Sequence, residues 1–177
     1  MQTAFGWSAL FMDNVEANLG SRRNSGGIPG KYPDDASYQT AIHGFLEYLY
    51  INYARAYNRP IFANITSYRN EQDVWFSYLS YLDGALMETW SVDWVSNNNY
   101  LDKTRWEYEL AWAEKTQNLG KQIILVASGN QTDTNRQKFS FASYLLISNG
   151  KAAFRYARSG NYTQVWQYDN YQVDLGS

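Results

Sequence analysis

Five short apolar runs alternate with longer segments of helical spacing, and this alternation constrains the fold more than any other feature of the sequence. Turn residues bound each run, and the runs occupy residues 8–13, 60–66, 84–89, 121–128 and 151–157. Each run has the length of a strand, and most are too continuously apolar to have one face in water. Such runs are typical of a parallel sheet with both faces covered. The sequence therefore predicts five parallel strands.

The segments between the runs carry apolar residues at intervals of three and four, as the buried stripe of a helix does. In one of them Trp106, Leu110 and Ala113 share a face. Gly120 follows this segment, as glycine often follows the last turn of a helix. We expect four helices, over residues 35–57, 71–82, 103–118 and 134–148.

The predicted order is β-α-β-α-β-α-β-α-β, which implies right-handed crossovers and either a doubly wound sheet or a barrel. No G-x-G-x-x-G motif follows the first run, and the connection over residues 18–35 is too long for a dinucleotide-binding turn. These features favour the α/β class and, within it, a (β/α)8 TIM barrel.

The chain is too short for a complete barrel of this kind. Eight strands typically take about 250 residues, whereas this chain has 177 residues and five predicted strands. We therefore expect a partial barrel that forms a single domain over residues 1–177. Because the outer strands of a partial barrel leave unpaired edges, we also expect self-association through these edges.

Composition excludes several classes of function. The net charge is −2, and no basic block follows a phosphate backbone, so nucleic acid is not an expected partner. The longest apolar run is far shorter than the roughly 20 residues of a membrane span. Cysteine is absent, and the single histidine, His43, lies in a predicted helix, so neither a thiolate nor a multi-histidine metal site is expected. We expect no metal and no cofactor.

The sequence does not assign a cellular compartment. Its first residues lack the basic segment and the long apolar core of a signal peptide. A signal peptide on a preceding segment would direct the protein to secretion.

Acidic and amide side chains follow the predicted strands, where a barrel places its reacting groups. Asp13 ends the first predicted strand, Asn64 lies near the end of the second, and Glu88 ends the third. Cleavage of a glycosidic bond commonly uses one carboxylate as nucleophile and another as general acid and base. Asp13 has polar neighbours, which suits an ionised nucleophile, whereas the apolar neighbours Met87 and Trp90 of Glu88 suit a general acid.

Two other acidic residues compete for these roles, and a structural role is open for all of them. Glu16 competes with Asp13, and Asp93 competes with Glu88, although each lies further into its loop. A carboxylate at a strand end also serves as a helix cap or as an acceptor within a loop. Spacing alone therefore does not decide between catalysis and structure.

Further side chains are expected around the same opening. Aromatic residues make up 18% of the chain, and their faces suit sugar rings, although packing accounts for most of them. We expect Trp90 to be a platform for a sugar ring. The expected substrate-binding residues are Asn14, Glu16, Asn64, Trp90, Asn130, Arg155 and Tyr156.

Several stretches resemble a known family. These are "ALFMDNVEANL", "IFANIT", "DGALMETW" and "FASYLLISNGKAAFRY", with "YDNY" and "DLGS" near the end. They resemble the hypothetical glycosyl hydrolases of family fifteen, which are grouped with the α-galactosidase-like superfamily of barrels. The resemblance covers essentially the whole chain and implies that it holds strands four to eight of a (β/α)8 barrel.

The resemblance also implies roles for the two carboxylates. In that superfamily the nucleophile follows strand four and the acid/base follows strand six, which implies Asp13 as nucleophile and Glu88 as acid/base. The superfamily usually has aspartate where Glu88 stands, and it has Asp-Gly where this chain has Ser8 and Ala9.

The expected function is therefore hydrolysis of the O-glycosidic bonds of a poly- or oligosaccharide, with retention of the anomeric configuration. Two alternatives are open. One is a carbohydrate-binding protein on a degenerate barrel that has no catalytic activity, and the other is a fragment that has no function alone.

Overall fold

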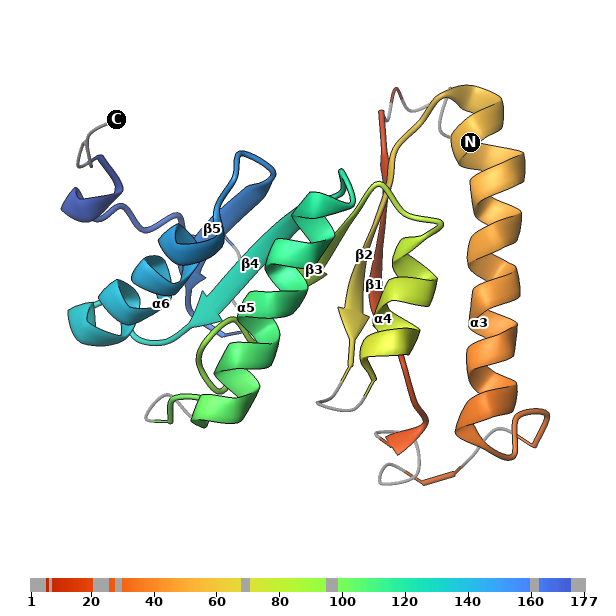
Figure 1. Cartoon of the computed structure of the whole chain (residues 1–177), viewed down its shortest axis with the longest axis horizontal. Helices are drawn as coiled ribbons and strands as arrows, with labels where there is room; N and C mark the ends of the chain where they lie inside the picture. Colours follow the sequence, from red (N-terminus) through yellow and green to blue (C-terminus); the bar gives the residue numbers. More distant parts are fainter. Residues whose placement is uncertain are drawn as a thin grey trace.

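Five parallel strands form one sheet, as the sequence predicts. The computed structural model describes residues 6, 8–20, 26–27, 30–67, 71–94, 99–159 and 163–172, and the "DLGS" motif lies outside them. The strands are β1 (Leu10–Glu16), β2 (Ile61–Thr66), β3 (Gly84–Met87), β4 (Gln122–Ser128) and β5 (Ala152–Ala157). They pair in chain order, β1-β2-β3-β4-β5 (Figure 1).

The four predicted helices are confirmed, with small changes of extent. They are α3 (Asp35–Leu49), α4 (Gln72–Leu79), α5 (Lys103–Asn118) and α6 (Thr134–Ile147). The first predicted helix continues beyond α3 as a π-helical segment, η1 (Tyr50–Arg55). Asp34 caps α3, because its side chain accepts a hydrogen bond from the backbone N–H of Ser37 at 2.7 Å. In the described part of the chain, no helix has both the length and the apolar character for a membrane crossing.

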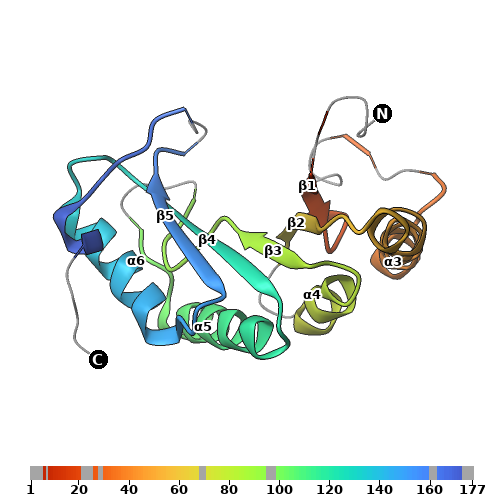
Figure 2. The same ribbon diagram turned by 90° about the horizontal axis from the view of Figure 1, so that it is seen from above.

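All four crossover helices lie on one face of the sheet. Figure 2 shows the strands as an arc, with α3, α4, α5 and α6 along one side of it. A doubly wound sheet would have helices on both faces, so this arrangement corresponds to a partial α/β barrel. Crossovers of one hand between strands that follow one another in order carry every helix to the same side.

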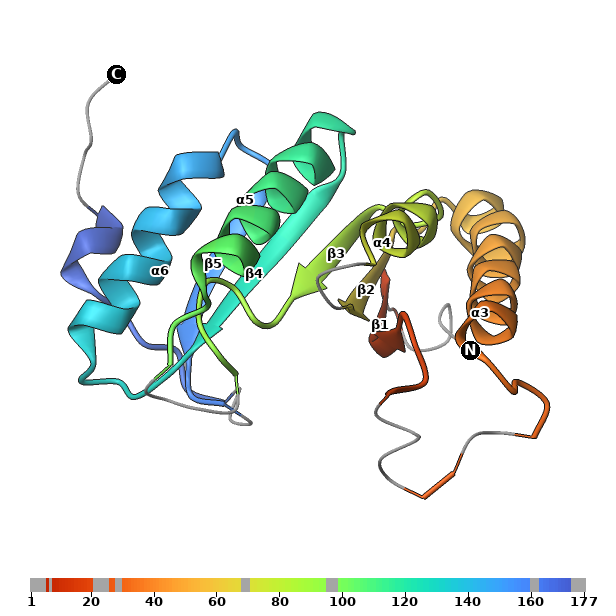
Figure 3. The same cartoon turned by 60° about the horizontal axis from the view of Figure 1, so that its bottom comes forward.

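The hydrophobic core lies between the sheet and these helices. Ile61, Ala63 and Ile65 of β2 are buried there, and the side chain of Asn64 points to the opposite face because side chains alternate along a strand. Trp75 of α4 and Trp112 of α5 meet in the helix layer with ring centroids 5.7 Å apart. Figure 3 shows α4 and α5 next to each other over β3 and β4.

Strand β1 is longer than predicted, and this changes the position of Asp13. The strand continues to Glu16, so Asp13 lies within β1 and not at its end. The pairing of β1 with β2 shifts between Met12 and Val15. Asn14 has a φ of 54°, in the left-handed region, which breaks the regular extended backbone at this point. The hydrogen-bond ladder between β1 and β2 is therefore interrupted in the middle of β1, next to Asp13.

The two outer strands generate a prediction about assembly. Among the described residues β1 pairs only with β2, and β5 only with β4, so two strand edges can pair with another chain. We expect an apparent mass above that of a monomer in light scattering. Phe11 on β1 is 48% exposed, and Phe11→Lys should lower the apparent mass because a charged side chain discourages pairing at the edge.

The matched control for this prediction is Phe45→Lys on α3, where Phe45 is 51% exposed and belongs to no strand. This variant should leave the apparent mass unchanged. A monodisperse monomer that unfolds cooperatively in calorimetry would contradict the expectation of self-association.

Candidate active site

Asp13 and Asn64 are joined at the C-terminal part of β1 and β2. The Nδ2 group of Asn64 donates a hydrogen bond to Oδ1 of Asp13 at 2.9 Å. The backbone N–H of Asn14 donates to the same oxygen, also at 2.9 Å. Asn64 is only 2% exposed, whereas Asp13 is exposed. A buried amide therefore fixes the orientation of an accessible carboxylate.

Glu88 directly follows β3 and lies half-buried at the same edge of the sheet. The strand arrows in Figure 1 end at this edge, where α4 and α5 begin. Here a cavity of about 400 Å³ extends from the ends of β2 and β3 to α4 and α5. Asn14, Asn64 and Glu88 line its strand side. The side chains that line it from the helices and from the connection after β3 include Trp75, Thr89, Asp93, Trp94, Arg105, Tyr108, Glu109 and Trp112.

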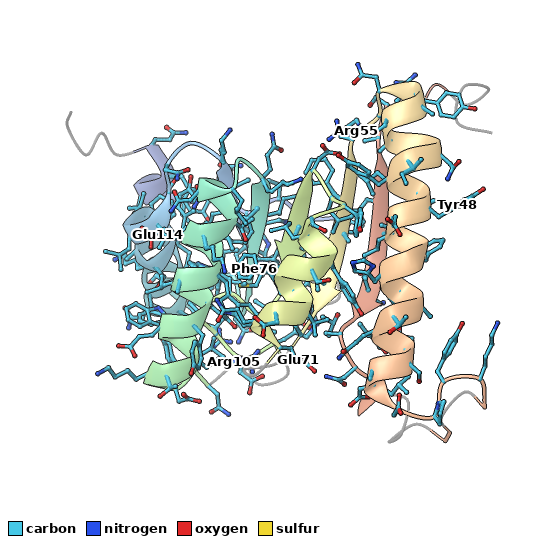
Figure 4. All side chains as sticks on the ribbon, turned by 45° about the vertical axis from the view of Figure 1, so that its right-hand side comes forward. Tyr48, Arg55, Glu71, Phe76, Arg105 and Glu114 are labelled. Carbon is cyan, nitrogen blue, oxygen red and sulfur yellow. The ribbon has the colours of Figure 1, made fainter. Side chains whose placement is uncertain are left out.

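Asp13 does not line this cavity itself. Its hydrogen-bond partner Asn64 does. The two predicted carboxylates are therefore linked to one space, Glu88 directly and Asp13 through its amide partner. Figure 4 shows Arg105 at the first turn of α5 and Glu71 at the start of α4, at the same end of the helix layer.

Glu109 is a third carboxylate at this cavity. It is 6% exposed, and it accepts hydrogen bonds from Thr89 Oγ1 at 3.1 Å, from the backbone N–H of Ser91 at 3.0 Å and from Arg105 Nε at 3.3 Å. Burial raises the pKa of Glu109 from 4.5 to about 7, although the hydrogen bond from Ser91 and the charge of Arg105 lower it. The loss of water around this carboxyl group therefore raises its pKa by more than the three donors lower it.

Two buried polar atoms near the cavity have no hydrogen-bond partner in the described part of the chain. They are the indole N–H of Trp112, a residue 5% exposed that lines the cavity, and the hydroxyl of Ser91. Buried polar groups nearly always have a partner. A water molecule or an oxygen atom of a ligand in the cavity would satisfy the indole N–H.

Arg136 of α6 connects the loops at this edge of the sheet. It is fully buried and donates to three backbone carbonyls, from Nε to Ser128 at 2.6 Å, from Nη1 to Asn99 at 2.7 Å and from Nη2 to Asp93 at 2.7 Å. The end of β4 and the connection between β3 and α5 are therefore held by one guanidinium group. Its fork of donors can serve several acceptors at fixed angles.

The structure corrects the expected roles of two aromatic residues. Trp90 is 0% exposed and its Nε1 donates to the carbonyl of Ser140 at 3.0 Å, so its ring is packed and offers no face to a sugar. Tyr156 is 1% exposed, and its hydroxyl donates to the carbonyl of Asn130 at 3.2 Å. Alternation along β5 turns Tyr156 toward the helices, so it does not line an open cleft.

The other predicted residues lie at the same edge of the sheet without meeting in one place. Glu16 is half-buried at the end of β1 and pairs in register with Thr66. Asn130 is exposed in the loop after β4, and Arg155 donates from Nη2 to the carbonyl of Gln164 at 2.8 Å. None of Glu16, Asn130 and Arg155 is among the residues that line the cavity.

Sequence reasoning missed the contribution of α5 to the site. The predicted buried face of this helix included Ala113, and Glu109 lies four residues before it. An acidic residue one turn from a buried alanine was the signal that Glu109 is buried. The contributions of Arg105 and Arg136 had no comparable signal, because an arginine on a helix is usually exposed.

The three carbonyls around Arg136 generate a stability prediction. Arg136→Lys keeps the charge but loses the fork, so at least two of the three backbone carbonyls lose their donor. We expect the free energy of unfolding to fall by roughly 2–4 kcal/mol. Chemical denaturation measures this change. Arg55→Lys is the matched control, since Arg55 is exposed and lies over the ring of Tyr50, and its effect should be within about 0.5 kcal/mol.

The buried carboxyl group of Glu109 predicts a pH dependence of stability. Its pKa is higher in the folded chain, about 7, than the ordinary 4.5, so the folded state binds the proton more tightly. The free energy of unfolding should therefore fall as pH rises from about 4.5 to about 7, by roughly 3 kcal/mol at most. In Glu109→Gln this part of the pH dependence should disappear. Equal pH dependence of urea unfolding in both proteins would contradict the prediction.

Comparison with known families adds an independent observation to this geometry. A comparison with curated proteins found no match. A family model described as hypothetical glycosyl hydrolase family 15 matches residues 2–177, which is essentially the whole chain. The strand ends, the hydrogen-bonded carboxylate and the cavity beside Glu88 thus occur in a sequence that this model covers from end to end, and the chain belongs to hypothetical glycosyl hydrolase family 15.

Proposed function

We propose that this protein hydrolyses O-glycosidic bonds of a poly- or oligosaccharide, with Asp13 and Glu88 as the catalytic pair. Asn64 carries the proposal, because the same side chain holds the carboxylate of Asp13 and lines the cavity that Glu88 also lines. Membership of a glycosyl hydrolase family supports the reaction class. The aromatic and polar walls of the cavity suit a sugar, whose rings have apolar faces and hydroxyl edges.

The proposed reaction retains the anomeric configuration and has two steps. Asp13 attacks the anomeric carbon while Glu88 gives its proton to the departing oxygen, so the glycosidic bond breaks as the bond to Asp13 forms. Glu88 then takes a proton from a water molecule while the oxygen of this water attacks the anomeric carbon, so the bond to Asp13 breaks, the sugar is released and the carboxylate of Asp13 is restored. The hydrogen bond from Asn64 holds the attacking carboxylate in one orientation throughout.

In the proposed fold, the five strands correspond to strands four to eight of a (β/α)8 barrel, and residues 1–177 form its C-terminal part as one domain. The one-sided helix layer supports this assignment (Figure 2). Asp13 and Glu88 would then face each other across the mouth of the barrel. Asn14 and Asn64 would contact the substrate from the strand side of the cavity, whereas Asn130, Arg155 and Glu16 would contact parts of a longer glycan.

Turnover of a glycan panel by the wild-type chain, Asp13→Asn and Glu88→Gln tests the proposal. Each variant should lose activity on the order of 10⁴-fold, since each removes a group that takes part in bond making or breaking. Glu114→Gln on the exposed side of α5 (Figure 4) is the matched control and should keep full activity. Equal turnover in all four proteins would rule out this catalytic pair.

The same panel distinguishes the alternative, a carbohydrate-binding protein without catalysis. If calorimetric titration shows that the wild-type chain binds a glycan that it does not turn over, the result would favour that alternative. The anomeric form of the first product, read by proton NMR before mutarotation, decides between retention and inversion.

A further inference from the structure

The turn that follows Glu88 is held by a side chain that takes no part in the proposed reaction. Thr89 and Ser91, one and three residues after Glu88, both donate hydrogen bonds to the carboxyl group of Glu109, at 3.1 and 3.0 Å. Glu109 comes from α5, eighteen residues after Ser91 in the sequence. One carboxyl group therefore connects helix α5 to the first turn after β3.

The residue between these two contacts is anchored as well. The backbone N–H of Trp90 donates to the carbonyl of Val126 at 3.2 Å, and its buried indole N–H donates to Ser140. Ser91 has a φ of 59°, a left-handed conformation that residues other than glycine rarely adopt. The hydrogen bond from its backbone N–H to Glu109 supports this conformation. Glu88 thus stands between β3 and a turn whose shape depends on Glu109.

Glu109 lines the cavity together with other charged side chains of the site. Arg105 on the same helix donates to it at 3.3 Å. Helix α4 contributes Trp75 to the cavity and, among the described residues, no charged side chain. The charged and titratable side chains that line the cavity with Glu109 are Arg105, Tyr108, Glu88 and Asp93. Glu88 and Glu109 therefore line the same cavity, and Thr89, the residue after Glu88, is hydrogen-bonded to Glu109.

We propose that Glu109 is a positioning residue for Glu88, and that the protonation state of its carboxyl group controls how tightly the turn 89–91 is held. This inference rests on the proposed role of Glu88. The ionised carboxylate accepts from three donors. When it takes a proton from solvent, one oxygen becomes a donor and the turn loses an acceptor. Because burial raises the pKa of Glu109 to about 7, this change falls within the pH range in which most enzymes work.

An NMR titration of the full chain tests the coupling without a substrate. The amide proton of Ser91 and the carboxyl carbon of Glu88 should both shift in the wild type with a midpoint near pH 7, the value of Glu109. In Glu109→Gln this step should be absent from both resonances. Gln117→Leu is the matched control, because Gln117 joins α5 to the carbonyl of Ile147 at 2.7 Å and does not touch the turn. The control should lower stability and keep the step.

Kinetic measurements on a glycan that the wild type hydrolyses provide the second readout. Glu109→Gln should lower kcat about 10- to 100-fold with little change in KM, since a small displacement of a catalytic group affects the transition state more than binding. Its profile of kcat/KM against pH should lose the inflection near 7, whereas Gln117→Leu should keep it. A variant Glu109→Gln with the profile of the wild type would overturn the proposal.

The two readouts separate the two hypotheses. If no glycan is hydrolysed by any of the proteins, the proposed function fails, and the NMR titration alone decides whether Glu109 is coupled to Glu88. If Glu88 gives the same titration curve in the wild type and in Glu109→Gln, the positioning role is wrong, whatever the activity.

Discussion

Consecutive strands of this chain lie side by side and run parallel, and the remaining architecture depends on this constraint. Each connection must return from one end of the sheet to the other, and crossovers of one hand carry α3, α4, α5 and α6 to the same face (Figure 2). The same constraint brings the C-terminal ends of all five strands to one edge. Asp13 and Asn64 lie near that edge on neighbouring strands, and Glu88 directly follows the next strand, β3.

Helix α5 serves both the core and the site, and this double use explains its composition. Trp112 and Ala113 fill the layer between helix and sheet, while Glu109 on the same buried side reaches the turn after β3. Burying a carboxyl group is unfavourable unless it is hydrogen-bonded or protonated. Glu109 meets the condition in both ways, since it has three donors and its pKa is raised to about 7. The arrangement costs stability at neutral pH and fixes the chain next to Glu88.

The sequence predicted the elements well and the roles of single side chains less well. Helix α5 was expected over residues 103–118 and is found at Lys103–Asn118, because its apolar spacing and the glycine that follows it are local signals. Strand β1 was expected to end at Asp13 and continues to Glu16, because a strand that pairs with a neighbour continues through polar residues. Trp90 and Tyr156 were expected in an open cleft and are buried, since their large apolar rings pack wherever a helix covers them.

In the described part of the chain, local pattern alone determined the order and the kind of the five strands and of the four helices that connect them, and the whole sequence determined the family. Tertiary structure decided three sets of hydrogen bonds. They are the bond from Asn64 to Asp13, the bonds from Thr89 and Ser91 to Glu109, and the bonds from Arg136 to three backbone carbonyls. Each of these contacts joins elements far apart in the chain. Spacing along a sequence specifies which face of a helix or strand a residue occupies, whereas the partner it meets depends on how strands pair and where each helix packs.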